Sequence, residues 1–156
     1  MVRQSEYGAF AEKLVYSHLK KRNKNVFKKK SKGYHFRFGD VQVGKNKETC
    51  KIIEVKGQGE DWGPDKGWDF VRSNIRISTA EYKFLKKYPT RFFIYVVYRL
   101  KYNKNPKWNV PKIAICEGND LAKLEPKITQ IGLTTPKEFW KKSIQIFPNR
   151  KLPAPK

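Results

Sequence analysis

Three ionisable side chains that could together hydrolyse a phosphodiester bond stand close in the sequence. Asp40 precedes Glu54 by fourteen residues, and Lys56 follows Glu54 after a single valine. In an extended strand the side chains alternate between two faces, so Glu54 and Lys56 are expected on one face, about 6.6 to 7 Å apart along the strand. Carboxylate oxygens bind Mg²⁺ or Mn²⁺, and a fixed ammonium stabilises negative charge on a reacting phosphate. The pattern therefore predicts a metal-dependent nuclease site.

The residues around these charges bear on whether they are functional. A Glu-x-Lys pair on a strand is usually a solvated face, and this alternative stays open for the tripeptide taken alone. However, Glu54 follows two isoleucines, and Asp40 stands behind Gly39 in a strand-like segment, 36–43, where acidic residues are disfavoured. Locally unfavourable charges that converge are typical of functional sites.

The composition favours a partner rich in phosphate. The chain has 35 Lys and Arg against 14 Asp and Glu, a formal net charge of +21 over 156 residues. Such an excess attracts nucleic acid and predicts binding that weakens steeply with salt. A protein that is basic for another reason, such as adaptation to a membrane surface, is the alternative. Because no apolar run approaches the length of a membrane span and no signal-peptide pattern is visible, we expect a cytoplasmic protein.

An amphipathic pattern near the start of the chain predicts a helix that Ser5 caps and that runs to about Arg22. Glu12 lies about 100° from the centre of the apolar stripe of this helix. It therefore either points into solvent or leans over the sheet as a further metal ligand. His18 lies on the stripe itself and is expected to be a core histidine rather than a catalytic base.

Three strands are expected next, over residues 26–30, 36–43 and 51–56, with a turn at 44–47 joining the last two. The first of them opens a basic segment. Its lysines form either a solvated edge that prevents sheet aggregation or a rim that contacts phosphate, and both interpretations stay open. These lysines are Lys28, Lys29, Lys30 and Lys32.

The segment 58–74 differs from its surroundings because it has no clean period and contains glycines, a proline and three large aromatic residues. A loop of this length in a compact domain is usually functional or mobile. Its aromatic side chains either pack beneath the loop or stack on exposed bases. On the second interpretation, the segment and its borders supply the nucleic-acid contacts Gln58, Trp62, Trp68, Arg72 and Arg76.

The second half of the chain alternates between helical and extended patterns. Ser78 and Glu81 have the spacing of a capping box, which opens a helix that ends before Pro89. The apolar run 92–98 suits a central strand covered on both faces, and 112–116 is the next strand. Helical turns are expected near 120–124 and 136–142. The predicted fold class is α/β, a mixed central β-sheet flanked by helices.

Length and composition predict one domain over residues 1–147, followed by a flexible basic tail with prolines over 148–156. Cys50 and Cys116 lie in strand-like segments and have no histidine at zinc-ligand spacing, so we expect buried thiols. The richness in lysine, tyrosine and isoleucine favours a thermophilic archaeal or viral source.

The order of these elements resembles the PD-(D/E)XK nuclease superfamily, which includes many restriction endonucleases and archaeal Holliday junction resolvases. A helix with Glu12, a strand with Asp40 and a strand with Glu54-Val55-Lys56 follow one another in the same order. The segments 8–15, 53–57 and 77–81, followed by 93–97, resemble the DUF3883 family of restriction-endonuclease-like domains. The resemblance covers about residues 5–100, and Gly39 stands where the superfamily name has proline.

The resemblance implies a role for each site residue. Asp40 and Glu54 would bind Mg²⁺ or Mn²⁺ with the backbone carbonyl of Val55, and Glu12 would complete the metal shell, as in some members. Lys56 would orient the attacking water and stabilise the transition state. The implied activity is hydrolysis of DNA phosphodiester bonds by an endonuclease, with RNA as an alternative substrate. Cutting both strands of a duplex would favour a homodimer. The competing hypothesis is a nucleic-acid-binding module with a nuclease-like fold, in which Glu54 and Lys56 form a structural ion pair.

Overall fold

The computed structural model describes the chain over residues 4–57, 74–98, 100, 111–124, 127–128, 131–134 and 144–145. Its elements in chain order are α1 (Gln4–Lys20), β1 (Val26–Lys28), β2 (Val41–Val43), β3 (Lys51–Gly57), β4 (Asn74–Ile77), α2 (Thr79–Lys87), the 3₁₀ turn η3 (Pro89–Arg91), β5 (Phe92–Tyr98), β6 (Lys112–Glu117), α3 (Gly118–Leu121), β7 (Lys127–Ile128), β8 (Ile131–Thr134) and β9 (Ile144–Gln145).

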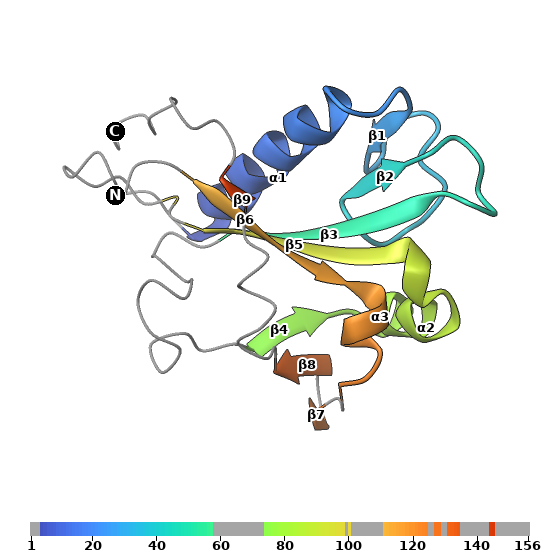
Figure 1. The fold of residues 1–156 in the computed structure, drawn as a ribbon, viewed down its shortest axis with the longest axis vertical. Helices are drawn as coiled ribbons and strands as arrows, with labels where there is room; N and C mark the ends of the chain where they lie inside the picture. The colour runs from blue at the N-terminus through green and yellow to red at the C-terminus, as the bar shows by residue number, and fades with distance from the viewer. Residues whose placement is uncertain are drawn as a thin grey trace.

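Within these residues the main sheet has the strand order β1-β2-β3-β5-β6-β9, and a smaller sheet has the order β4-β8-β7. Strands β3 and β5 run parallel, whereas the other neighbours in the main sheet are antiparallel. Helix α1 covers one face of the main sheet, and α2 and α3 lie on the other side (Figure 1). The predicted α/β class with a mixed central sheet flanked by helices is confirmed.

The side chains of β3 alternate between the two faces as the sequence predicts. Ile53 and Val55 belong to the core cluster that α1 covers. Ile52 belongs to the opposite cluster, which includes Phe84 and Leu85 of α2. Since alternate residues share a face, Glu54 and Lys56 project on the side of α2.

Strand β5 is the central strand that its apolar run predicts. It lies between β3 and β6, with Glu54 opposite Ile94 and Lys56 opposite Val96. The side chains of Phe92, Ile94 and Val96 are fully buried, and so is that of Val97 on the other face. Burying this strand on both faces holds β3, and with it the candidate site, in a fixed register.

Helix α1 begins at Gln4 and not after a cap at Ser5. It crosses β3 closely at Gly57, where an added Cβ would meet the backbone carbonyl of Tyr7. His18 is buried, and its Nδ1 lies 3.2 Å from Nη1 of Arg22. Burial and the nearby Arg22 and Lys21 charges lower the pKa of His18. His18 is thus a core histidine, as expected.

The strand predicted over 36–43 is wrong for residues 36–40, because β2 contains only Val41–Val43. Gly39 has φ +77°, in the left-handed region that glycine adopts without a steric cost, and this breaks the extended conformation just before Asp40. A Cβ at Gly39 would collide with the side chain of Ile52 and lie 2.9 Å from Oη of Tyr34. Proline, with φ near −65°, cannot adopt this conformation.

A buried amide holds the segment before β2 in place. Gln42 is fully buried, and its Oε1 accepts a hydrogen bond from the backbone amide of His35 at 2.8 Å. Its Nε2 donates to the carbonyls of Gly33 at 3.0 Å and Gly44 at 2.9 Å. Three hydrogen bonds satisfy the side chain and tie both ends of the β2 segment together.

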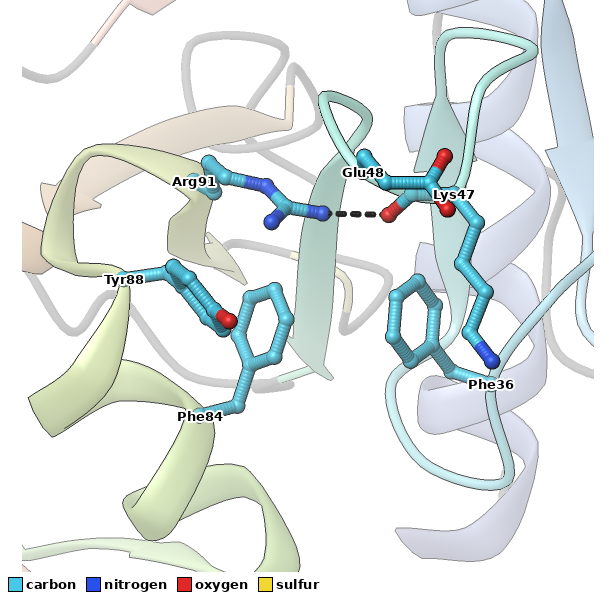
Figure 2. A pocket seen from close by; sticks show the side chains of 6 residues that line it. All are labelled: Phe36, Lys47, Glu48, Phe84, Tyr88 and Arg91. Carbon is cyan, nitrogen blue, oxygen red and sulfur yellow. Dashed lines mark hydrogen bonds between the residues drawn. The ribbon is translucent and has the colours of Figure 1, made fainter.

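At the far end of α2, a pocket of ≈ 290 Å³ is lined by Phe36, Lys47, Glu48, Phe84, Tyr88 and Arg91 (Figure 2). The Arg91 side chain donates to the carbonyls of Lys47 at 2.6 Å and Cys50 at 2.9 Å. Its guanidinium lies over the rings of Phe84 and Tyr88, at 5.1 and 4.8 Å from their centroids. Arg91 thereby joins the end of α2 to the turn before β3.

In the second half of the chain, the predicted helix cap is confirmed and two elements differ from the prediction. The capping box of Ser78 and Glu81 is confirmed, and α2 ends before Pro89. Strand β4 was not predicted, and α3 begins at Gly118, earlier than the expected turn at 120–124.

Cys50 and Cys116 are buried thiols that form no disulfide, as expected. The turn at 136–142 and the tail at 148–156 lie outside the described residues. No helix in the described part of the chain could cross a bilayer.

Candidate active site

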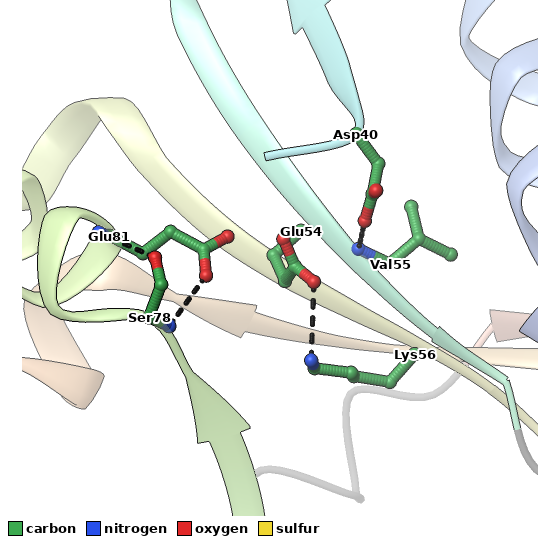
Figure 3. Close-up of polar contacts among 6 residues, drawn as sticks. All are labelled: Asp40, Glu54, Val55, Lys56, Ser78 and Glu81. Carbon is green, nitrogen blue, oxygen red and sulfur yellow. Dashed lines mark hydrogen bonds and ion pairs between the residues drawn. The ribbon is translucent and has the colours of Figure 1, made fainter. Parts of the chain in front are cut away.

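Asp40 is fixed where the β2–β3 ladder ends. Val41 is paired with Ile53, and the backbone amide of Asp40 donates to the carbonyl of Ile53 at 2.9 Å. Asp40 itself lies just before β2, which begins at Val41. Its Oδ2 accepts a hydrogen bond from the amide of Val55 at 2.7 Å (Figure 3). The carboxylate of Asp40 is thus held beside the peptide between Glu54 and Lys56.

Glu54 and Lys56 face each other on the α2 side of β3. Nζ of Lys56 lies 3.2 Å from Oε1 of Glu54 (Figure 3). The Glu54 side chain is only 13% exposed, and that of Lys56 is 30% exposed. The two side chains therefore form a mostly buried contact, which is an ion pair when Glu54 is ionised, and they are not a pair of solvated side chains.

The backbone of Val55 is oriented towards Asp40. In a strand the N–H and C=O groups of one residue point to the same neighbour. Because the amide of Val55 donates to Asp40, its carbonyl also points to that edge. The Val55 carbonyl, predicted as a metal ligand, therefore lies on the same edge of β3 as Asp40.

Glu12 reaches the site from the opposite face of the sheet. Its side chain is exposed on α1, but its carboxyl lies beside that of Asp40. Partial burial, the Asp40 charge and a hydrogen bond with Asp40 raise the pKa of Glu12 to about 6, and Lys29 opposes the shift. Of the two predicted placements, Glu12 thus leans towards the site, where it meets Asp40.

Glu81 is a neighbour of Glu54 that sequence reasoning treated only as part of a helix cap. Burial, a hydrogen bond with Glu81 and the charge of Asp40 raise the pKa of Glu54 to about 9, against the opposing charge of Lys56. Burial alone would also raise the pKa of Glu81, but hydrogen bonds with Glu54 and Ser78 and the charge of Lys56 lower it below its ordinary value. The signal available in the sequence was a glutamate at a capping position where glutamine would serve equally well.

The donor atoms of the site suit a hard divalent cation. Four carboxyl groups interact in succession: Glu12 is hydrogen-bonded to Asp40, the charge of Asp40 acts on Glu54, and Glu54 is hydrogen-bonded to Glu81. Within the described residues, no three acidic, histidine or cysteine side chains already surround a common point. One buried oxygen of Glu81 nevertheless receives no hydrogen bond from an amide, ammonium or hydroxyl group in that part of the chain. Carboxylate oxygens are what Mg²⁺ and Mn²⁺ prefer, so the residues present fit such an ion.

The basic segment borders this site. Lys28, Lys29, Lys30 and Lys32 are all exposed. The backbone amide of Lys29 donates to the carbonyl of Asp40 at 3.1 Å, which places the segment beside the carboxylates. Nζ of Lys28 lies 4.5 Å from the ring centroid of Tyr16.

The other predicted nucleic-acid contacts can be placed only in part. Arg76 is exposed on β4, at the border of the aromatic segment. The remaining residues predicted to contact nucleic acid lie outside the described residues: Gln58, Trp62, Trp68 and Arg72.

The fold and site define an α/β domain with a carboxylate–lysine site on its central parallel strand pair. A family model described as Protein NO VEIN, C-terminal, matches residues 11–111, so the chain belongs to this family. The family is related to the restriction-endonuclease-like DUF3883 domains that the sequence resembles. The match includes all the carboxylates of the site and Lys56. No curated protein and no solved structure matches the chain.

Proposed function

We propose that this protein is a metal-dependent nuclease of the PD-(D/E)XK type that hydrolyses DNA phosphodiester bonds as an endonuclease. The observation that carries the proposal is the placement of Asp40. Its carboxylate is bonded to the amide of Val55, between Glu54 and Lys56, although fourteen residues separate Asp40 from Glu54. A remote carboxylate is thereby held beside the strand residues that carry a buried carboxylate and an ammonium, and these are the groups that the nuclease chemistry uses.

Each residue of the site would have its own role in the reaction. Asp40, Glu54 and the carbonyl of Val55 would hold Mg²⁺ or Mn²⁺, with Glu12 reaching the Asp40 side. The bound ion would polarise the phosphoryl oxygen and lower the pKa of the attacking water. Lys56, already 3.2 Å from Glu54, would hold positive charge where negative charge develops on the phosphate and orient the water.

DNA is the proposed partner because of the charge of the whole chain and the place of the basic segment. The net charge of +21 creates a field that attracts a polyanion. The exposed lysines next to Asp40 would contact phosphates beside the scissile bond and so set the position of the strand. A homodimer would allow both strands of a duplex to be cut. RNA is the alternative substrate.

The test is cleavage of labelled single-stranded, duplex and branched DNA, and of RNA, with Mg²⁺, Mn²⁺ or EDTA. The wild type is compared with Lys56→Ala. We expect metal-dependent cleavage that falls by about 10²- to 10³-fold in the variant, while binding to DNA persists. EDTA should abolish cleavage by the wild type.

A binding module without chemistry is the second candidate, and one observation favours it. Glu54 and Lys56 form the ion pair that this alternative expects of them. A buried pair can be retained for the structure alone. Tight, salt-sensitive binding by the wild type, without cleavage of any substrate under any of these metal conditions, would support this alternative and refute the nuclease.

A further inference from the structure

Glu81 carries one more oxygen than its place in the helix requires. Oε1 accepts a hydrogen bond from the backbone amide of Ser78 at 2.8 Å, and the Ser78 hydroxyl accepts from the amide of Glu81 at 3.1 Å. These two bonds complete the capping box of α2. Oε2 takes no part in them. It is buried and receives no hydrogen bond from an amide, ammonium or hydroxyl group in the described part of the chain, and its hydrogen-bonding neighbour is the Glu54 carboxyl.

Burial of Oε2 of Glu81 costs solvation free energy. The Glu81 side chain is only 5% exposed. An ionised carboxylate loses several kcal/mol of solvation on burial unless a partner compensates for it. Glutamine completes a capping box as well as glutamate does, without burying a charge. The helix cap therefore explains Oε1 but not the negative charge.

The orientation of the side chain indicates what compensates the charge. Oε2 of Glu81 is turned towards the carboxyl of Glu54 across the gap between α2 and β3 (Figure 3). The ammonium of Lys56 is at 3.2 Å from Glu54 and supplies a single positive charge to this pair. Two carboxylates that face each other repel, so they need a bridging cation or a shared proton.

We propose that Glu81 is a ligand of the divalent cation at the candidate active site and shares the ion with Glu54. This inference rests on the proposed metal-dependent function. It adds a metal ligand from α2, on the same face of the main sheet as Glu54 and Lys56. Glu12, by contrast, approaches Asp40 from the face that α1 covers. The ion is thus held between the sheet and the first turn of α2.

The test is the affinity of the DNA-free protein for Mn²⁺, measured by isothermal titration calorimetry and by Mn²⁺ electron paramagnetic resonance. The variant Glu81→Gln keeps an oxygen for the amide of Ser78 but loses the charge. We expect its affinity for Mn²⁺ to fall at least about 10-fold, with a thermal unfolding midpoint at or above that of the wild type. Mn²⁺ binding by this variant with wild-type affinity would overturn the inference.

Ser78→Ala is the matched control for the cap. It removes the hydroxyl that accepts from Glu81 but leaves the backbone amide of Ser78 and the Glu81 carboxylate in place. We expect a lower thermal unfolding midpoint, because a helix cap is lost, with the Mn²⁺ affinity of the folded protein unchanged. A loss of affinity equal to that of Glu81→Gln would assign the effect to the cap and overturn the inference.

Two further outcomes are separable. If Glu81→Gln prevents folding, Glu81→Asp is used in its place. Its shorter side chain keeps the charge but moves it away from Glu54, so weaker Mn²⁺ binding is again expected. A wild type that binds no Mn²⁺ would refute both this inference and the metal-dependent function. A wild type that binds Mn²⁺ as tightly as the Glu81 variants would refute this inference alone.

Discussion

The amide of Val55 donates a hydrogen bond of 2.7 Å to Oδ2 of Asp40. This contact joins the residue before β2 to the middle of β3. It uses Oδ2 of the carboxylate, and the same carboxyl group is hydrogen-bonded to Glu12. Since an asparagine oxygen can accept the same bond, the geometry of Asp40 and its charge can be separated by mutation.

Asp40→Asn should therefore preserve the fold and remove the chemistry. We expect the metal-dependent cleavage rate to fall by about 10²-fold or more, because a negative ligand is lost while the contact with Val55 is kept. The thermal unfolding midpoint should change little. Single-turnover cleavage and thermal unfolding measure the two effects. A variant that cleaves at the wild-type rate would show that the Asp40 charge takes no part in the reaction.

Gly39→Ala should destabilise the protein by about 2–4 kcal/mol. Gly39 has φ +77°, and an added Cβ would collide with Ile52 and approach the hydroxyl of Tyr34. The backbone must shift to make room, and Asp40 shifts with it. Urea unfolding gives the stability change, and cleavage assays should show a loss of activity in the protein that remains folded.

Gly8→Ala is the matched control for this substitution. Gly8 lies in α1, and nothing outside the helix lies within 4 Å of an added Cβ. Alanine restricts the unfolded chain and favours the helix, so a gain of about 0.5–1 kcal/mol is expected. Equal effects of the two alanines would contradict the left-handed conformation of Gly39.

The stability of the metal-free protein should fall as the pH rises from about 5 to about 8. In EDTA the folded Glu54 keeps its proton up to about pH 9, since burial, Glu81 and Asp40 raise its pKa and Lys56 only partly opposes them. The nearby Tyr34 phenol has a raised pKa and stays neutral over this range. The unfolded chain releases the Glu54 proton near its ordinary value of 4.5 and then binds fewer protons than the folded chain.

Glu54→Gln should flatten this pH dependence, because an amide cannot ionise. Urea unfolding of both proteins between about pH 5 and about pH 8 should show a variant that gains stability relative to the wild type as the pH rises, by at least about 1 kcal/mol. A constant difference between the two proteins would mean that Glu54 titrates normally in the folded state.

Replacing Lys29, Lys30 and Lys32 by alanine should weaken binding to DNA without regard to its sequence. The slope of log affinity against log salt should decrease in magnitude by about 0.9 for each lysine that contacts a phosphate. Fluorescence anisotropy at several salt concentrations measures the slope. The control replaces three exposed lysines on other elements, Lys20, Lys83 and Lys123. The same slope change in both triple variants would argue for the general field of the protein and against a rim at the site.

Local patterns in the sequence predicted the elements that carry the site. The alternation along residues 51–56 places Glu54 and Lys56 on one face, and this holds in β3. The capping box of Ser78 and Glu81 was equally predictable. Both features depend on contacts between residues a few positions apart. The spacing of residue types along the chain predicts such contacts.

The approach of the carboxylates to one another was decided by the tertiary structure. Asp40 reaches Val55 because the backbone turns at Gly39 and not because 36–40 is a strand, and a positive φ leaves no periodic signal. Glu81 faces Glu54 because α2 packs on the sheet face from which Glu54 projects. The sequence by itself determined which residues carry charge and on which side of their own element they lie. The direction of a side chain across the gap between two elements depends on how those elements pack, which no local pattern encodes.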